Sequence, residues 1–357
     1  MKATQKVDYI VIGQGLAGSA VAIQLLQREK KILVIDQPVK NNSSRIAAGL
    51  FNPITGKKMV KTWLADDVFP YLHQYYREIE KVSGYTFFYP MPLYRPFISV
   101  EEQNEWMGRS ADEAFKAYIS QVFIQKTVPN VKDPYGGLLL QQCGYLDTTQ
   151  YILAVRQWIM REGYFLTEDF QEDDLQVNLS GVVYRDWKAD RVIFCQGSRQ
   201  SRWFNWIPIR PLKGETLSIA ADVALEYVIN RGIYIVPTSH QKQFRIGSTY
   251  YFQDTTEVIT DQARQELEEK MEQLTSFPYA VINQEWGFRP TTPDRRPILG
   301  QHPEFKPLAV FSGLGTKGVS LAPYFSDVLI RSLENGGTIN NAVNVSRYKS
   351  LYWSVPK

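Results

Sequence analysis

The chain has 357 residues, of which 44% are hydrophobic, so it is long enough for two domains with ordinary globular cores. Its formal net charge is +3 and the charged residues are interspersed, which argues against nucleic acid or a membrane surface as its main partner. The two cysteines, Cys143 and Cys195, give neither a disulfide framework nor metal-ligand spacing, so we expect no metal. With no membrane-length apolar run and no room for a signal peptide, the expected location is a reducing cytoplasm.

The first predicted elements are a buried strand, a glycine turn and a helix. Residues 9–18 read Tyr-Ile-Val-Ile-Gly-Gln-Gly-Leu-Ala-Gly. We expect Gly13 to allow the tight turn, Gly15 to let a pyrophosphate approach the backbone, and Gly18 to let the helix pack on its strand. The free N–H groups at the helix start favour negative charge. The candidate phosphate contacts are Gly13, Gln14, Gly15, Leu16, Ala17 and Gly18.

A second apolar strand, residues 32–35, ends in Asp36, eighteen residues beyond Gly18. An acid at this point accepts hydrogen bonds from the ribose of an adenosine dinucleotide. No arginine is adjacent to Asp36 in the sequence, which argues against a 2′-phosphate on that ribose. The residues alone leave FAD and NAD open.

The remaining elements alternate between helical and extended patterns. The pattern predicts an amphipathic helix from Pro70 to about Val82, short strands in the aromatic, proline-punctuated residues 87–94, a helix over 149–161 and a strand over 191–197. Antiparallel strands are expected between Leu217 and Phe252, then a charged helix over 261–275 and a last helix from Val319 to about Leu333. Two domains are therefore expected to interleave along the chain.

The strand before the last helix ends in a second glycine turn, Gly313-Leu314-Gly315-Thr316-Lys317-Gly318. A second dinucleotide site is not expected here, because no strand with an acid follows the helix. The helix start would instead face a cofactor group that gains negative charge, such as the pyrimidine edge of a flavin, and Lys317 would add to that field. The simpler alternative is a tight turn with Lys317 in solvent.

These motifs together resemble the D-amino-acid oxidase-like family of FAD-dependent oxidoreductases, which includes glycine and sarcosine oxidases. The resemblance implies an α/β fold, in which a Rossmann-like FAD-binding domain is interleaved with a mainly antiparallel β-sheet substrate domain. The implied FAD-binding domain comprises residues 1–82, 140–207 and 286–357, and the substrate domain comprises residues 83–139 and 208–285. Further cofactor contacts implied by the resemblance are Arg45, Ala48 and Gly197, with Gly313, Gly315, Thr316, Lys317 and Gly318 at the flavin edge.

The most specific part of the resemblance is Gly287-Phe288-Arg289-Pro290. In the family, the arginine of this motif binds the substrate carboxylate, and a guanidinium suits that role because it bonds bidentately and stays charged. The alternative for Arg289 is an ion pair with an acid of the chain. The resemblance also places Tyr234 and Tyr250 in the substrate sheet as candidate pocket walls, with ordinary sheet aromatics as the alternative.

The resemblance implies oxidation of the C–N bond of a small amine or amino acid by hydride transfer to non-covalently bound FAD. We assign no general base, and His73, His240 and His302 lie in dissimilar contexts that indicate structural or exposed side chains. Two interpretations are open for Lys57, Lys58 and Lys61: they bind an anionic substrate, or they are solvated. We favour solvation. The competing functions are an NAD-dependent dehydrogenase and a flavin-dependent tRNA-modification oxidase. The sequence leaves open the substrate, the oligomeric state and whether the flavin enzyme is an oxidase or a dehydrogenase.

Overall fold

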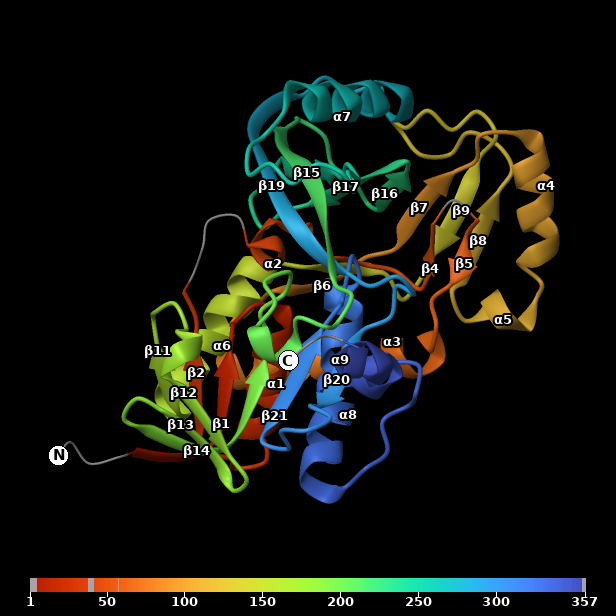
Figure 1. Ribbon diagram of the computed structural model, residues 1–357. Helices are drawn as coiled ribbons and strands as arrows, with labels where there is room; N and C mark the ends of the chain where they lie inside the picture. The colour runs from red at the N-terminus through yellow and green to blue at the C-terminus, as the bar shows by residue number, and fades with distance from the viewer. Residues whose placement is uncertain (1–4, 38–41, 57, 355–357) are drawn as a thin grey trace.

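The computed structural model describes residues 5–37, 42–56 and 58–354, and it contains two large mixed or antiparallel sheets (Figure 1). Sheet 1 has parallel strands at its centre and an antiparallel extension at one edge. Its strands, given in spatial order from one edge, are β11 (Tyr164–Leu166), β2 (Ile32–Ile35), β1 (Gln5–Ile12), β14 (Trp187–Phe194), β13 (Gly181–Tyr184) and β12 (Leu175–Asn178). On the side away from β1, the first half of β14 pairs with β13 and its second half pairs with β21 (Leu308–Ser312). Strand β21 also pairs with β20 (Ile298–Gln301).

Sheet 2 is mainly antiparallel, as the sequence predicted. Its strands are β19 (Ala280–Thr291), β15 (Arg210–Ala220), β18 (Gln243–Gly247), β17 (Ile233–Pro237), β16 (Val228–Arg231), β7 (Leu93–Pro96), β9 (Gly137–Leu140) and β8 (Ile119–Phe123). A small third sheet holds β3 (Leu50–Phe51), β10 (Gly144–Leu146) and β6 (Phe88–Pro90), and β4 (Ile54–Thr55) pairs with β5 (Val60–Lys61). Both large sheets combine distant stretches of chain, so the interleaved fold is confirmed; the exact domain boundaries stay a prediction.

Helices cover the faces of both sheets. They are α1 (Leu16–Leu26), α2 (Ser43–Ile46), α3 (Ala65–Ser83), α4 (Val100–Arg109), α5 (Glu113–Lys116), α6 (Thr148–Glu162), α7 (Asp261–Leu274), α8 (Gly318–Asn335) and α9 (Lys349–Ser354). Short 3-10 turns lie at Glu172–Asp174, Arg202–Phe204 and Val345–Tyr348. No helix in the described part of the chain is long and apolar enough to cross a bilayer.

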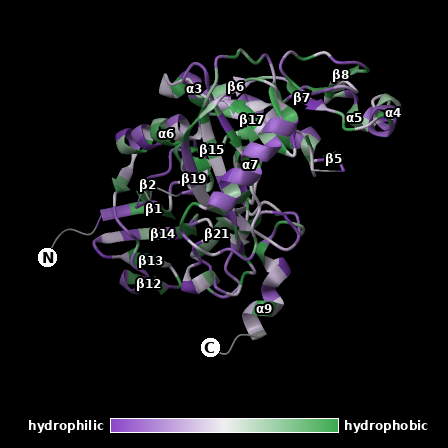
Figure 2. Cartoon of the chain, turned by 90° about the horizontal axis from the view of Figure 1, so that it is seen from above, coloured by the Kyte–Doolittle hydropathy of each residue, from purple (hydrophilic) through white to green (hydrophobic). Residues whose placement is uncertain are grey.

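The core divides according to which sheet face a residue occupies. Apolar side chains on one face of sheet 1 pack against α1, α3, α6 and α8, and alternate residues form a second cluster on the other face. A third cluster lies between sheet 2 and α7. Polar residues occupy the outer surface of α7, which shows as the hydrophilic side of that helix in Figure 2.

Two local expectations were wrong. The helix expected to begin at Pro70 begins at Ala65, where the acids Asp66 and Asp67 occupy and favour its first turn, so that Pro70 lies inside the helix. The aromatic residues 87–94 also do not enter one sheet. Strand β6 joins the small third sheet and β7 joins sheet 2, because the chain turns at Met91, whose N–H bonds to the carbonyl of Cys143.

The glycine turn after β1 shows why that segment needs glycine. Gly13 has φ +91°, and a Cβ at Gly18 would lie 1.8 Å from the carbonyl oxygen of Gly13. The first helix can therefore contact its strand only when Gly18 lacks a side chain. The expected roles of Gly13 and Gly18 follow from this packing.

We predict that Gly18→Ala lowers the free energy of unfolding by about 1–3 kcal/mol, because a backbone oxygen cannot move aside as a side chain can. Gly108→Ala is the matched control. Gly108 lies inside α4 with open space around its missing Cβ, so alanine there should stabilise the protein by roughly 0.5–1 kcal/mol. Urea unfolding of both variants at equal cofactor loading measures the effect; equal stabilities for Gly18→Ala and wild type would contradict the packing argument.

Candidate active site

The carboxyl ends of four parallel strands, β2, β1, β14 and β21, lie together at one end of sheet 1, which we call the cofactor edge. Ile12 of β1 is in register with Ile35 of β2 and with Phe194 of β14, and Phe194 is in register with Val310 of β21. Each of these strands is followed by a predicted cofactor residue, namely Gly13, Asp36, Gly197 and Gly313. The Ser312 hydroxyl donates to the carbonyl of Gly197 at 2.9 Å, which ties two of these turns together. The parallel register therefore gathers the predicted cofactor residues.

The starts of α1 and α8 lie against each other at this edge. A Cβ on Gly318, the first residue of α8, would lie 2.9 Å from a side-chain carbon of Leu16, the first residue of α1. Ala17 and Gly18 are buried in the first turn of α1. Two helix N-termini therefore offer partial positive charge to one region, which favours an anionic group.

Asp36 is held by two partners at the end of β2. The backbone N–H of Gln14 donates to one carboxylate oxygen at 2.9 Å, and Arg156 of α6 donates to the other at 3.0 Å. Arg156 also donates to the side-chain oxygen of Gln14 at 2.8 Å. The sequence analysis did not identify Arg156. This residue is 120 positions away from Asp36, and the helical periodicity shows it only as one polar residue among others. No arginine adjoins Asp36 in the sequence, but Arg156 adjoins it in space, where its guanidinium is engaged by Asp36 and Gln14.

A second arginine lies near this network. Burial lowers the pKa of Arg156 most, Asp36 opposes this shift, and the charge of Arg45 lowers the pKa further. Arg45 lies half-buried in α2. Ser44 of the same helix accepts from the N–H of Leu16 at 3.1 Å. The predicted contact Ala48 follows in the same segment and is half-buried. Helix α2 thus places a cation close to the start of α1.

The turn at 313–318 joins the cofactor edge to sheet 2. Gly313 and Gly315 have φ +70° and +54°, and the N–H of Gly315 donates to the carbonyl of Pro290 at 2.9 Å. Thr316 is exposed, whereas Lys317 is half-buried and donates to the Thr62 hydroxyl at 3.1 Å. Burial, and then the charge of Arg295, lower the pKa of Lys317. Lys317 is therefore not a freely solvated lysine.

The lysine-containing segment lies beside this turn. Thr62 binds Lys317, and the ring of Trp63 lies 4.8 Å from the guanidinium carbon of Arg296. Lys58 is exposed and Lys61 pairs with Asp66 at 2.7 Å, while Lys57 falls outside the described residues. Lys58 is therefore in solvent, whereas Lys61 forms an ion pair with Asp66.

Arg289 lies on the face of sheet 2 that points toward the cofactor edge. It pairs with Leu212 of β15, and its guanidinium fills the space where a Cβ on Gly214 would be, 2.1 Å from Nη2. The Ser248 hydroxyl accepts from Nη2 at 2.6 Å, and the Thr249 carbonyl accepts from Nη1 at 3.3 Å. Within the described ranges no carboxylate forms an ion pair with Arg289, so the ion-pair alternative has no support here.

The two predicted tyrosines flank Arg289. The ring of Tyr250 lies 4.8 Å from the guanidinium carbon, and the Tyr234 hydroxyl lies beside Gly247, one residue before Ser248. Burial raises the pKa of Tyr234 to about 12, against a smaller opposing effect of Arg289. Tyr250 is 54% exposed, so it covers the guanidinium from the solvent side. The structure thus brings Arg289, Tyr234 and Tyr250 together.

Arg245 connects this face to the cofactor side. It donates to Glu285 at 2.7 Å and to the carbonyl of Ile46, which ends α2, at 3.0 Å. Sheet 2 is therefore attached directly to the helix that carries Arg45. The predicted substrate residues and the predicted cofactor residues therefore lie in neighbouring parts of the fold.

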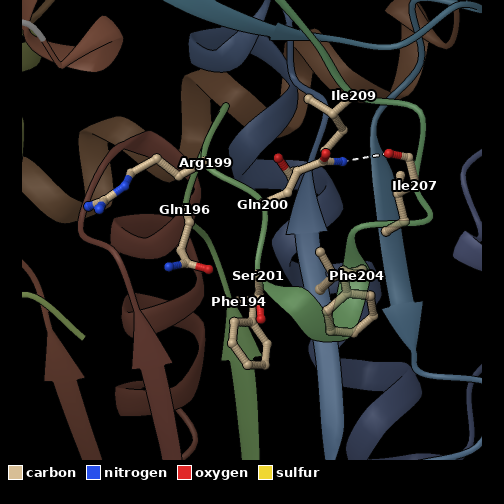
Figure 3. A pocket seen from close by; sticks show the side chains of 10 residues that line it. Phe194, Gln196, Arg199, Gln200, Ser201, Phe204, Ile207 and Ile209 are labelled. Atoms are coloured by element: carbon tan, nitrogen blue, oxygen red, sulfur yellow. Dashed lines mark hydrogen bonds between the residues drawn. The ribbon is translucent and has the colours of Figure 1, made fainter. Parts of the chain in front are cut away.

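A small pocket shown in Figure 3 lies on the other face of sheet 1. Its walls include Phe194, Phe204, Ile207 and Val310, which belong to the cluster opposite α1 and α8. It contains none of the predicted cofactor or substrate residues. We therefore locate the site at the strand ends and not in this pocket.

None of the histidines reaches the site. His73 packs edge-on against Phe51 and Phe88, where burial lowers its pKa. His302 is buried and accepts two backbone N–H bonds at Nδ1, and His240 is exposed. Among the described residues no group of three or more His, Cys, Asp or Glu side chains could hold a metal ion. These positions agree with the structural or exposed roles expected for the histidines.

The residues at the cofactor edge fit a dinucleotide that carries a flavin. The start of α1 would face the pyrophosphate, Asp36 and Arg156 would stand at the adenosine end, and Gly197 has open space where a side chain would be. Lys317 and the start of α8 stand at the other end, beside the substrate face. This order matches a molecule with a pyrophosphate between two ring systems.

Comparison with known proteins gives the same assignment. The family described as FAD dependent oxidoreductase matches residues 8–331. The chain is 25% identical over 346 residues to the bifunctional protein ThiO/ThiG of Synechocystis, covering 88% of this chain and 50% of that protein. It is 24% identical over 341 residues to the tRNA 5-methylaminomethyl-2-thiouridine biosynthesis bifunctional protein MnmC of Hydrogenovibrio crunogenus, covering 83% and 47%. The chain spans about half the length of these curated relatives.

Among solved structures, glycine oxidase from Bacillus cereus shares the fold. It superposes with a TM-score of 0.78 at 17% identity, covering 94% of this chain and 97% of that one. The match to the family extends over most of the chain, from β1 to the last turns of α8, and includes every predicted cofactor residue. The chain therefore belongs to the family of FAD-dependent oxidoreductases, and FAD is its cofactor.

Proposed function

We propose that this chain oxidises the C–N bond of a small amine or amino acid that carries a carboxylate. The observation that carries the proposal is the Arg289 guanidinium, which has no carboxylate partner in the described residues and lies on the sheet face next to the flavin-edge turn. A half-buried cation held by neutral partners is suited to an anionic ligand. Glycine oxidase, which shares the fold, is named for an amino acid of this class.

Each residue of the substrate face has a distinct role in the proposal. Arg289 holds the carboxylate, and Ser248 fixes the guanidinium so that little freedom is lost when substrate binds. Tyr234 and Tyr250 form the walls. FAD, when bound, supplies the acceptor for the hydride that leaves the substrate carbon.

Proton transfer requires little from the chain. The Tyr234 phenol stays protonated at neutral pH, because its pKa is raised to about 12. It can therefore donate a hydrogen bond but cannot act as a base. We infer that the substrate reacts with its amine already neutral, and we assign no general base.

Non-covalent attachment of FAD is part of the proposal. Both thiols are buried, and burial raises the pKa of Cys143 and of Cys195, so neither is available as a thiolate. Cys195 lies directly under the first glycine turn, where its carbonyl is 2.6 Å from a Cβ built on Gly13. We expect the flavin to be released when the protein unfolds.

The tRNA-modification alternative is favoured by one observation, the similarity to MnmC. The net charge of +3 and the interspersed charges favour a small-molecule substrate. A gel shift with tRNA at increasing salt separates the alternatives, since nucleic-acid binding weakens steeply with salt. Retained, salt-sensitive tRNA binding would support the alternative. The cytoplasmic location expected from the cysteine content stays a prediction.

We predict that Arg289→Lys retains FAD but loses most of its reduction by carboxylate-bearing amines. Lysine keeps the charge but cannot make two parallel bonds to a carboxylate, so the reacting carbon is misplaced. Loss of one such contact corresponds to about 1.5–3 kcal/mol, or roughly tenfold to more than a hundredfold in the second-order rate of flavin reduction. Anaerobic stopped-flow bleaching of the flavin measures that rate.

The matched control is Arg264→Lys, because Arg264 lies on α7 and pairs there with Glu268. This control should reduce at the wild-type rate. Wild-type rates in Arg289→Lys, with FAD absorbance retained, would rule out carboxylate anchoring by this residue.

We predict that Asp36→Ala and Arg156→Met both weaken FAD retention, Asp36→Ala by a factor of about ten or more. The two residues are in direct contact, so the double variant should lose less than the product of the single effects. Arg161→Met on the same helix is the control, because Arg161 bonds only to neighbouring Glu162 in the described residues. Ultrafiltration and flavin absorbance measure retention; unchanged retention in Asp36→Ala would make it a structural residue at the strand end.

A further inference from the structure

Two charged side chains are fully buried on the face of β15 opposite Arg289. Side chains alternate along the strand, so Gly214 faces Arg289 while Lys213 and Glu215 face the α7 side. Both Lys213 and Glu215 are 0% exposed. Charged groups this deep require partners. They are not among the residues to which the proposed function assigns a role.

Their partners come from the segment 251–260, which connects β18 to α7. Lys213 donates to Asp254 at 2.7 Å and to the Thr256 hydroxyl at 2.9 Å. Glu215 accepts from the N–H and hydroxyl of Thr260 at 3.0 and 2.9 Å. Lys213 therefore holds the middle of the segment, and Glu215 holds its end.

The start of the segment is hydrogen-bonded to the same strand. The N–H of Tyr251 donates to the carbonyl of Lys213 at 3.0 Å, and the N–H of Lys213 donates back at 3.2 Å. The hydroxyl of Thr249 accepts from the N–H of Glu215 at 2.9 Å. Alternation then directs Tyr250 to the Arg289 face, where its ring meets the guanidinium, and Tyr251 to Glu266 of α7.

Apolar packing does little to hold this segment. Its large hydrophobic residues Phe252, Val258 and Ile259 are 62%, 57% and 51% exposed. The position of the segment therefore depends on the polar contacts to β15. If Asp254 moved away, buried Lys213 would lose its shorter ion pair, at 2.7 Å, and keep only the longer contact with Glu215 at 3.7 Å, so the pair with Asp254 favours one arrangement.

We propose that Lys213 and Asp254 are positioning residues that hold the segment 251–260 against β15 and thereby keep the Tyr250 ring on Arg289. The inference rests on the proposed function, because it assigns Tyr250 and Arg289 to the substrate site. The hydrogen bond from Lys213 is the main cause that lowers the pKa of Asp254 to about 2, with Thr256 adding to it. A depressed carboxyl pKa means that the pair is intact above the usual Asp pKa and is lost only as the pH falls toward 2.

The test uses the FAD-loaded full chain with Asp254→Asn and Lys213→Met. Chymotrypsin cleaves after aromatic residues, so cleavage at Tyr250, Tyr251 and Phe252, followed by mass spectrometry, reports release of the segment. Titration with benzoate, followed by flavin absorbance, reports carboxylate binding. We expect both variants to be cleaved in this segment about tenfold faster than wild type, and to bind benzoate about fivefold or more weakly.

Lys242→Met is the matched control, because it removes an exposed pair with Asp222 at 2.7 Å in the same sheet region. It should match wild type in both measurements. Lys213→Met leaves Glu215 beside an apolar side chain, so it is the variant that is more prone to misfold. Asp254 is partly exposed, and Asp254→Asn therefore decides the question if Lys213→Met does not fold.

Wild-type cleavage of the segment in Asp254→Asn would overturn the proposal. Faster cleavage with unchanged benzoate affinity would also overturn it, because the pair would then hold the segment without positioning Tyr250 for a carboxylate. If wild type neither binds benzoate nor is reduced by any amino acid, the proposed function fails. Cleavage alone then decides whether the pair holds the segment.

Discussion

The whole site depends on the parallel register of β2, β1, β14 and β21. In a parallel sheet the carboxyl ends of all strands lie at one edge, and short turns there are the only parts of these segments free to contact a ligand. Gly13, Asp36, Gly197 and Gly313 follow the four strands in turn. Residues from three distant stretches of chain therefore meet without any of them leaving its local structure.

A second constraint is the alternation of side chains on β15 and β19. Residues 212, 214 and 216 face the substrate side, whereas 213, 215 and 217 face α7. Gly214 leaves room for the Arg289 guanidinium, while its neighbours Lys213 and Glu215 secure a surface segment on the other side. One strand thereby supports the proposed binding face and the segment that borders that face.

The cations are arranged along the edge in a way that suits one long anionic cofactor and one small anionic substrate. Arg45 and Arg156 lie at the α1 end, Lys317 and Arg295 at the α8 end, and Arg289 on the facing sheet. Many other charged residues of the described chain form ion pairs at the surface, where a salt bridge contributes little. The modest net charge of the chain therefore conceals a local positive field.

The sequence by itself determined the local motifs. The glycine turn after β1, the acid ending β2 and the turn before α8 could be recognised because glycine tolerance and helix-start chemistry depend on neighbouring residues. The Arg289 motif was recognised through the family resemblance. The fold class followed from the order of strand and helix patterns and from the family resemblance. These features act over a few positions, so no tertiary information was needed to recognise them.

Only the tertiary structure decided which residues partner them. Arg156 reaches Asp36 across 120 positions, Ser248 reaches Arg289 across 41, and Asp254 reaches Lys213 across 41. Nothing in the periodicity of α6 distinguishes Arg156 from a solvated arginine, and Lys213 sits in a strand where burial of a lysine is not expected. Such partners are set by packing between distant segments, and short-range patterns carry no record of that packing.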